Sequence, residues 1–291
     1  MDAQSAERPA LRMTRRGVLV ASAGAVAVAA GVIVGADKLI TDLGGLGGIF
    51  GDSGHNIEGS FYSRYRRRVV GYTVGYPQGH GPGSTLPVVI AMHGFRGNHR
   101  SAVSGYSPSG AASLANDIHP LAVVTVDGGQ GYWHPHPGDD PMSMVTRELI
   151  PLLNARGLGI GTRQTAVMGT SMGGYGALIF AEHYPATFAA AAAISPAIFE
   201  TYSWAHYVNA GAYYDASDFA SYDAITHAGQ LSGQPVRVAS GDEDPFHPWV
   251  EDFKRALPAP GFVDFSPGGH NGAFFASQTG PSIRFIASHF A

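Results

Sequence analysis

The chain has 291 residues, of which 45% are hydrophobic and 14% are charged, and its formal net charge is −4. These values are typical of a folded globular chain and exclude a disordered one, and the acidic balance excludes a broad basic surface for nucleic acid. The lack of cysteine excludes disulfides, thiol nucleophiles and thiolate metal sites. A chain of this length can fold as one large domain or two small ones.

The N-terminal segment, residues 1–36, has the pattern of an export signal. Arg15 and Arg16 precede an uncharged run from Gly17 to Ala36, and signal sequences have a basic stretch followed by an apolar one. The stretch TRRGVL resembles a twin-arginine export signal. The run also reaches the ~20 residues that span a bilayer. We therefore expect an exported bacterial protein, either cleaved after Ala36 and secreted or anchored in the cell envelope by this segment.

The remainder of the chain is expected to contain a glycine-rich linker, residues 37–59, and one folded domain, residues 60–291. In that domain, apolar runs of strand length alternate with helical patterns. Strands are expected at residues 68–76, 87–93, 121–127, 165–169, 188–194, 235–240 and 261–265, and helices at 144–154, with a bend or break at Pro151, 173–184 and 281–290. This alternation predicts an α/β fold, with a mostly parallel sheet covered by helices on both faces. Reactive groups of such sheets gather in loops at the carboxyl ends of the strands.

A serine among glycines occupies one of these loops, in the stretch AVMGTSMGGYGA at residues 166–177. The pattern G-x-S-x-G is weak evidence in a chain with 40 glycines. Its position is stronger evidence, because Ser171 follows a predicted strand and precedes a predicted helix. Gly169 and Gly173 would let that strand and helix approach closely. Ser171 is therefore a candidate nucleophile on a tight strand-to-helix turn.

A serine hydroxyl needs a base that a carboxylate holds in place. Asp242, Glu243 and Asp244 follow the strand predicted at 235–240, and His270 follows the one at 261–265. These residues follow Ser171 in the order acid, then histidine, which is the order expected for a serine on such a turn. We favour Asp244 as the acid, with Asp242 as the main alternative.

The reaction also needs N–H donors for a developing oxyanion. The turn HGFRG at residues 93–97 follows the strand predicted at 87–93, which is where one donor is expected, and the residue after the nucleophile supplies the other. These positions nominate the backbone N–H groups of Phe95 and Met172. The alternative is that the sequence at 93–97 is only a glycine-containing turn.

Four stretches together, GTSMGGYGAL, HGFRG, GDEDPF and PGGHNGAFF, resemble the α/β-hydrolase superfamily. Within it they resemble the esterase group that includes esterase D and the antigen 85 mycolyltransferases. The resemblance covers the chain from about Arg68 to the C-terminus. It implies a triad of Ser171, Asp244 and His270, an oxyanion hole of Phe95 and Met172, and no cofactor.

Two departures from the mycolyltransferase pattern weigh against mycolyl transfer more than against ester chemistry. His93 replaces an aspartate in the turn before the arginine, Arg96, which is a candidate substrate contact. Aspartates dominate the acidic cluster, where mycolyltransferases have a glutamate as the triad acid.

Residues 195–233 are rich in aromatic side chains and are expected to form a small lid over the site. Its rings could hold an acyl chain or stack on a sugar, or they could form the lid's own core. We take Trp204 in this insertion, and Trp133 outside it, as candidate substrate contacts. The lid rings are Phe199, Tyr202, Trp204, Tyr207, Tyr213, Tyr214, Phe219 and Tyr222.

Two further clusters have weaker functional interpretations. His134, His136 and His247 suggest a metal site, but the ligands lack a typical metal-binding spacing, so we expect none. The basic run at residues 64–68 is expected to be a solvated edge, or a surface facing anionic lipid if the protein is anchored.

The sequence therefore predicts an exported serine esterase that acts on a small-molecule, lipid or glycan ester. The first alternative is a cell-envelope acyltransferase that moves an acyl group to a sugar hydroxyl. The second is an anchored binding module that has the fold without the activity.

Overall fold

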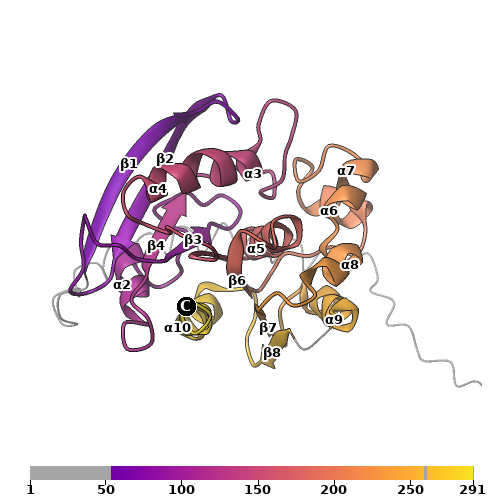
Figure 1. The fold of residues 1–291 in the computed structure, drawn as a ribbon. Coiled ribbons are helices and arrows are strands. Elements are labelled where there is room, and N and C mark those ends of the chain that lie inside the picture. Colours follow the sequence, from indigo (N-terminus) through magenta and orange to yellow (C-terminus); the bar gives the residue numbers. More distant parts are fainter. Residues whose placement is uncertain (1–53, 259–260, 291) are drawn as a thin grey trace, which may run out of the picture.

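The computed structural model describes residues 54–258 and 261–290, which form a sheet with helices on both faces (Figure 1). The expected export segment, residues 1–36, lies outside the described residues. The eight-stranded sheet has the order β1-β2-β4-β3-β5-β6-β7-β8. The strands are β1 (His55–Ser63), β2 (Arg68–Tyr76), β3 (Val88–Met92), β4 (Ala122–Val126), β5 (Thr165–Thr170), β6 (Phe188–Ile194), β7 (Val236–Gly241) and β8 (Phe262–Ser266).

The sheet is antiparallel at one edge and parallel elsewhere. Strand β2 runs antiparallel to both β1 and β4, and all the pairs from β4 to β8 are parallel. Strand β1 pairs along its whole length with β2, from His55 opposite Tyr76 to Ser63 opposite Arg68. The sheet therefore begins at His55 and includes residues 55–59, which the glycine content had suggested were linker.

Helices cover both faces of the sheet, and alternate strand residues enter two separate cores. In β3, Ile90 and Met92 pack in one core, whereas Val89 and Ala91 pack in the other, as the period of two of a strand requires. One core includes residues of α2 and α10, and the other includes residues of α5 and α9. The helices are α2 (Pro108–Ser113), α3 (Pro141–Met144), the π-helical η1 (Val145–Leu149), α4 (Ile150–Asn154), α5 (Met172–His183), α6 (Tyr202–Val208), α7 (Ala216–Ser221), α8 (Ala224–His227), the 3₁₀-helical η2 (Ala228–Leu231), α9 (His247–Ala256) and α10 (Gly272–Ala287).

Two prolines have different positions in helices from those predicted. Helical structure continues through Pro151, and the wider π turn of η1 comes just before it, which suits a residue that cannot donate an α-helical hydrogen bond. Pro281 resembled a helix start, but it lies inside α10, which begins at Gly272. The side chain of Asn271 caps that earlier start by accepting the Phe274 N–H at 3.1 Å. No helix of the described residues is long and apolar enough to cross a membrane.

The insertion between β6 and β7 forms α6, α7, α8 and η2, beside α5 and α9 (Figure 1). Phe199, Tyr213 and Phe219 are buried, whereas Tyr207 and Tyr214 are exposed. Several rings of this segment therefore form its own core. This was one of the two interpretations of these rings that the sequence allowed.

Helix α5 carries a buried carboxyl group that has no hydrogen-bond partner among the described residues. Both side-chain oxygens of Glu182 are buried and unpaired. Burial raises the pKa of Glu182 well above its usual value, and the negative charge of Asp223 adds to the rise. The group therefore stays neutral in the folded protein over a pH range in which the unfolded chain ionises.

The free energy of unfolding is expected to fall as pH rises above about 4.5, the ordinary value for this group. The unfolded chain loses the Glu182 proton first, so the slope can reach about 1 kcal/mol per pH unit. Glu182→Gln should remove this slope and stabilise the protein at pH 8, whereas replacement of the exposed Glu200 by glutamine should not. Urea unfolding from pH 5 to pH 8 measures the effect, and equal pH dependence of wild type and Glu182→Gln would contradict it.

Candidate active site

Ser171 lies on the sharp turn between β5 and α5. Its backbone is at φ 57° and ψ −120°, which is a strained conformation for a residue other than glycine. Its N–H donates to the carbonyl oxygen of Ile194 at 2.9 Å, which ties the turn to the end of β6. The side chain is partly exposed. The turn thus presents the hydroxyl at the carboxyl edge of the parallel strands.

Glycine is required where this turn packs against its neighbours. A Cβ atom on Gly169 would lie 2.2 Å from the backbone of Gly173, and one on Gly173 would lie 2.0 Å from the carbonyl oxygen of Met92. These separations are too short for any side chain. The two glycines that flank Ser171 therefore let β5, α5 and the end of β3 meet.

His270 connects Ser171 to an acidic side chain. The loop between β8 and α10 places the His270 Nε2 atom 2.8 Å from the Ser171 Oγ atom, and the Nδ1 atom 2.9 Å from Oδ2 of Asp244. A carboxylate only accepts, so Nδ1 carries the proton and Nε2 is free to accept from the serine hydroxyl. The rings of Phe246 and Phe275 pack against the imidazole, with centroids 5.1 and 5.0 Å away.

The structure distinguishes among the three acids of the predicted cluster. Asp244 is buried, and its Oδ1 atom accepts the Phe246 N–H at 2.9 Å. Asp242 and Glu243 are exposed. Burial by itself would raise the pKa of Asp244, but the hydrogen bond and charge of His270, with the Phe246 N–H, hold the pKa below its usual value. Asp244 is thus an ionised carboxylate aimed at His270 near neutral pH.

The two candidate oxyanion donors lie beside Ser171. A Cβ atom on Gly94 would lie 3.6 Å from the Ser171 Cβ atom, so the peptide that joins Gly94 to Phe95 borders the hydroxyl. Met172 is the first residue of α5, where backbone N–H groups have no helical acceptor. Among the described residues, neither the Phe95 N–H nor the Met172 N–H donates to a protein group. Both are available to a ligand.

Comparison with known proteins assigns the chain to a family. A model of the family described as Putative esterase matches residues 65–257. The chain belongs to the Putative esterase family. No curated protein sequence matches the chain significantly.

Solved structures show that this esterase-family chain has the α/β-hydrolase fold. A ferulic acid esterase has a TM-score of 0.67 at 18% identity, over 81% of this chain and 99% of the other. The S-formylglutathione hydrolase from Agrobacterium tumefaciens has a TM-score of 0.66 at 20% identity, over 82% of this chain and 96% of the other. MPT51 (FbpC1) of Mycobacterium tuberculosis has a TM-score of 0.60 at 17% identity, over 80% of this chain and 99% of the other.

Two of the predicted substrate contacts of this family member lie at accessible positions. Arg96 is exposed at φ 63° in the turn after Gly94, and its guanidinium lies over the Phe95 ring, 5.5 Å from the centroid. Trp204 on α6 is partly buried, with its ring centroid 6.1 Å from that of Trp249. Trp249 contacts Phe246, which contacts His270. Trp204 is therefore linked to the site through two further rings.

Trp133 is not a substrate contact in this structure, which corrects the prediction. Its side chain has no exposed surface. Its Nε1–H donates to the carbonyl oxygen of His93 at 3.2 Å, and its ring fills the space left by Gly128 and Gly176. Trp133 therefore belongs to the core beneath the site, and the aromatic residue type alone did not reveal its burial.

The histidine pair at 134 and 136 has protein partners. The His134 ring stacks between Tyr213 and Tyr222, and its Nε2 atom lies 2.7 Å from the carbonyl oxygen of Ala212. Burial, together with the nearby His136, lowers the pKa of His134 to about 4. The described residues contain no group of three acidic or histidine side chains that could hold a metal ion.

One arginine of the basic run is buried, contrary to the expected solvated edge. Arg66 donates to both carboxylate oxygens of Asp139, at 2.6 and 3.0 Å, and to the carbonyl oxygen of Asp127 at 2.5 Å. The run of positive charges gave no signal of this burial. Arg66 thus supports the end of β4 from within the protein.

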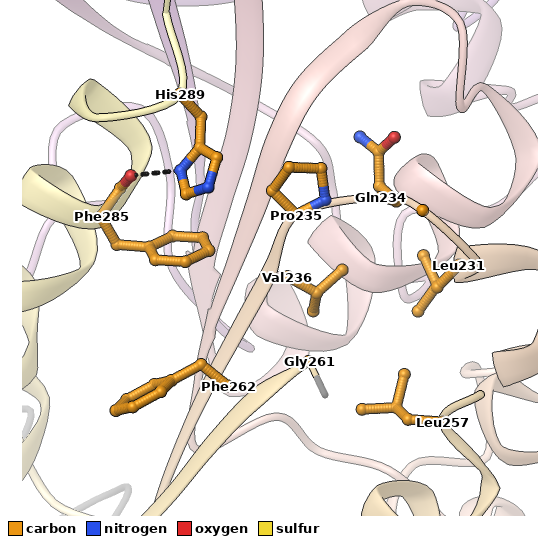
Figure 2. A pocket seen from close by; sticks show the side chains of 10 residues that line it. Leu231, Gln234, Pro235, Val236, Leu257, Gly261, Phe262, Phe285 and His289 are labelled. Carbon is orange, nitrogen blue, oxygen red and sulfur yellow. Dashed lines mark hydrogen bonds between the residues drawn. The ribbon is translucent and has the colours of Figure 1, made fainter. Parts of the chain in front are cut away.

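A separate hollow of about 290 Å³ is lined mainly by apolar side chains (Figure 2). Pro235 and Val236, at the start of β7, and Phe262, at the start of β8, line it together with Phe285 and His289 of the C-terminal segment. The starts of parallel strands lie at the opposite edge from their carboxyl ends. This hollow is therefore not part of the candidate active site.

Proposed function

We propose that the protein is a serine esterase that hydrolyses carboxylic esters through an acyl-enzyme. The observation that carries this proposal is the chain of hydrogen bonds from Asp244 through His270 to Ser171. A serine hydroxyl becomes an effective nucleophile when a positioned base takes its proton. Membership of the Putative esterase family and the fold shared with proteins named as esterases and hydrolases support the same chemistry.

The proposed reaction begins when the Ser171 oxygen attacks the ester carbonyl carbon and its proton moves to Nε2 of His270. Asp244 stabilises the resulting imidazolium without taking the proton. The carbonyl oxygen becomes an oxyanion that accepts from the N–H groups of Phe95 and Met172. His270 then protonates the leaving alkoxide, which leaves an acyl group on Ser171. Water attacks this acyl-enzyme with His270 as base and releases the acid.

The substrate we propose is a small-molecule, lipid or glycan ester, met outside the cytoplasm. Export is supported by the sequence pattern of residues 1–36 alone. Arg96 and Trp204 are the proposed substrate contacts. Arg96 is exposed in the turn that carries Phe95, and Trp204 is partly exposed and connects to His270 through the rings of Trp249 and Phe246. A sugar hydroxyl could replace water at the acyl-enzyme, since the same triad serves either acceptor and the shape and dryness of the cleft decide between them.

The test combines covalent labelling with a substrate series. A fluorophosphonate probe is expected to label the wild type and not Ser171→Ala, and the wild type should hydrolyse p-nitrophenyl esters. Hydrolysis rates on esters with short and long acyl chains show which chain length the enzyme prefers. The same assays with and without a sugar show whether water or the sugar hydroxyl accepts the acyl group. Transfer to the sugar in preference to water would replace the hydrolase proposal by the acyltransferase. A folded wild type that neither labels nor hydrolyses would favour the binding module.

A further inference from the structure

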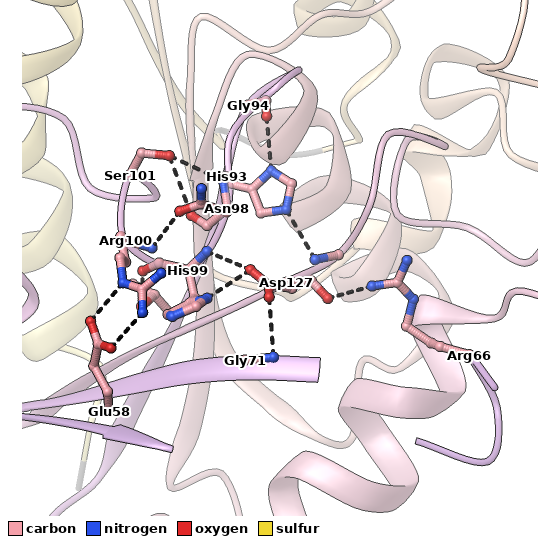
Figure 3. Close-up of polar contacts among 12 residues, drawn as sticks. Glu58, Arg66, Gly71, His93, Gly94, Asn98, His99, Arg100, Ser101 and Asp127 are labelled. Atoms are coloured by element: carbon pink, nitrogen blue, oxygen red, sulfur yellow. Dashed lines mark hydrogen bonds and ion pairs between the residues drawn. The ribbon is translucent and has the colours of Figure 1, made fainter. Parts of the chain in front are cut away.

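A second histidine lies beneath the candidate oxyanion turn. His93 follows β3 and is buried, and Figure 3 shows its ring next to the carbonyl of Gly94. The His93 Nδ1 atom is 2.8 Å from the Gly94 carbonyl oxygen, and the Nε2 atom is 3.0 Å from the backbone nitrogen of Gly128. The indole of Trp133 packs on the ring at a centroid distance of 5.0 Å. The imidazole is therefore held on two sides by backbone groups.

These two contacts determine the protonation state of the ring. The Gly128 N–H can only donate, so the His93 Nε2 atom must accept and carries no proton. The Nδ1 atom then carries the proton and donates it to the Gly94 carbonyl oxygen. Burial lowers the pKa of His93, which favours the same neutral form. Backbone geometry thus selects one tautomer.

The bond to Gly94 acts on the peptide group that carries the Phe95 N–H. The Gly94 carbonyl and the Phe95 N–H belong to one planar trans peptide, so they point in opposite directions. The Gly94 oxygen accepts from His93 and also from the Gly97 N–H at 3.0 Å. Two donors on the carbonyl thereby fix the direction of the N–H at the other side of the plane.

The remainder of the turn is held by the end of β4 and the loop after it. The Oδ1 atom of Asp127 accepts from both the N–H and the Nδ1 atom of His99, each at 2.8 Å, and its Oδ2 atom accepts the Gly71 N–H at 3.1 Å (Figure 3). The Arg96 N–H donates to the side-chain oxygen of Gln130. Asp127 directly precedes Gly128, so one segment binds His93, at the start of the turn, and His99, just after it.

We propose that His93 is a positioning residue whose Nδ1–H bond to the Gly94 carbonyl aims the Phe95 N–H at the oxyanion formed on Ser171. His93 is buried and both its ring nitrogens contact backbone groups, so its proposed action is through the peptide plane. The proposal rests on the proposed esterase function. It requires the donor at the Nδ1 position and not merely a ring that fills the space.

Two amide variants separate these requirements. In His93→Asn, the side-chain NH₂ can occupy the Nδ1 position and donate to the Gly94 carbonyl. In His93→Gln, the side-chain oxygen can reach the Nε2 position and accept the Gly128 N–H. The glutamine then leaves the Gly94 carbonyl without its side-chain donor. We expect His93→Gln to lower kcat on p-nitrophenyl acetate by about 10- to 100-fold and to leave KM within about threefold of the wild type. Deletion of an oxyanion donor lowers kcat by about 10²- to 10³-fold, and a misdirected donor should lower it less. His93→Asn should retain kcat within about threefold of the wild type.

A tetrahedral inhibitor gives a second measurement on the same proteins. The inhibition constant of phenylboronic acid should rise with His93→Gln by about the factor lost in kcat, because the boronate places an oxygen at the oxyanion position. Urea unfolding of both variants shows whether they are folded. Wild-type kcat for His93→Gln, or an equal loss in both folded variants, would overturn the positioning role.

The tautomer itself is measurable without any variant. Nitrogen-15 NMR of histidine-labelled wild type should show His93 as the neutral Nδ1–H form at pH 7 and pH 8, and an Nε2–H or charged ring at these pH values would overturn the proposal. A wild type that neither hydrolyses the ester nor reacts with a fluorophosphonate would contradict the proposed function and the positioning role together. An active wild type with a His93→Gln variant of equal kcat would contradict the positioning role alone.

Discussion

Replacement of Ser171 by alanine is expected to lower kcat on p-nitrophenyl esters by about 10⁴- to 10⁶-fold, because the hydroxyl that forms the acyl-enzyme is absent. His270→Ala should cause a loss of similar size, since the Ser171 hydroxyl then lacks the base that lies 2.8 Å from it in the structure. The two side chains act as one unit. The kcat of the double variant should therefore be about the same as that of either single variant. If the two losses multiplied, its kcat would be far lower.

Steady-state kinetics on the three variants measures this non-additivity. Ser217→Ala is the matched control, because Ser217 is an exposed serine on α7, and it should keep wild-type kcat. Losses that multiply in the double variant would show that Ser171 and His270 act independently and would contradict the shared mechanism.

Replacement of Asp244 by asparagine is expected to lower kcat by about 10⁴-fold with little change in the fold. The buried carboxylate holds the proton of His270 on Nδ1 across a distance of 2.9 Å. The amide of asparagine can instead donate to Nδ1, which moves the imidazole proton to Nε2. In that tautomer the imidazole cannot accept the proton of Ser171.

Asp242→Asn is the matched control for this prediction. Asp242 lies two residues earlier and is exposed, so kcat should stay within about twofold of wild type. Measurement of kcat for both variants, with circular dichroism to compare their folds, tests the assignment of the acid. A large loss for Asp242→Asn with an active Asp244→Asn would reverse it.

The strand pattern and the turn sequences were sufficient to predict much of the fold. Apolar runs of strand length alternate with helical patterns, and both periods are local properties of the chain. They predicted seven of the strands in the described residues, with boundaries close to those observed. The strand β1 was missed because its glycine and polar residues lack a strand pattern, and its long-range pairing with β2 makes it part of the sheet. The start of α10 was missed because Pro281 resembled a helix start, although Asn271, whose side chain accepts the Phe274 N–H, is a local N-cap signal ten residues earlier.

The candidate site divides in the same way. Ser171, His270 and the HGFRG turn could be named from the chain because residue type, neighbouring glycines and position after a strand are all local. The choice of Asp244 over Asp242, the burial of Trp133 and the contact of His93 with Gly94 and Gly128 depend on which segments pack together. Burial and hydrogen-bond partners are set by residues distant in the chain, as when β4 and its following loop support the turn after β3. The sequence therefore identified the candidate reacting groups, and the packing of the sheet edge decided which acid, which tautomer and which amide direction accompany them.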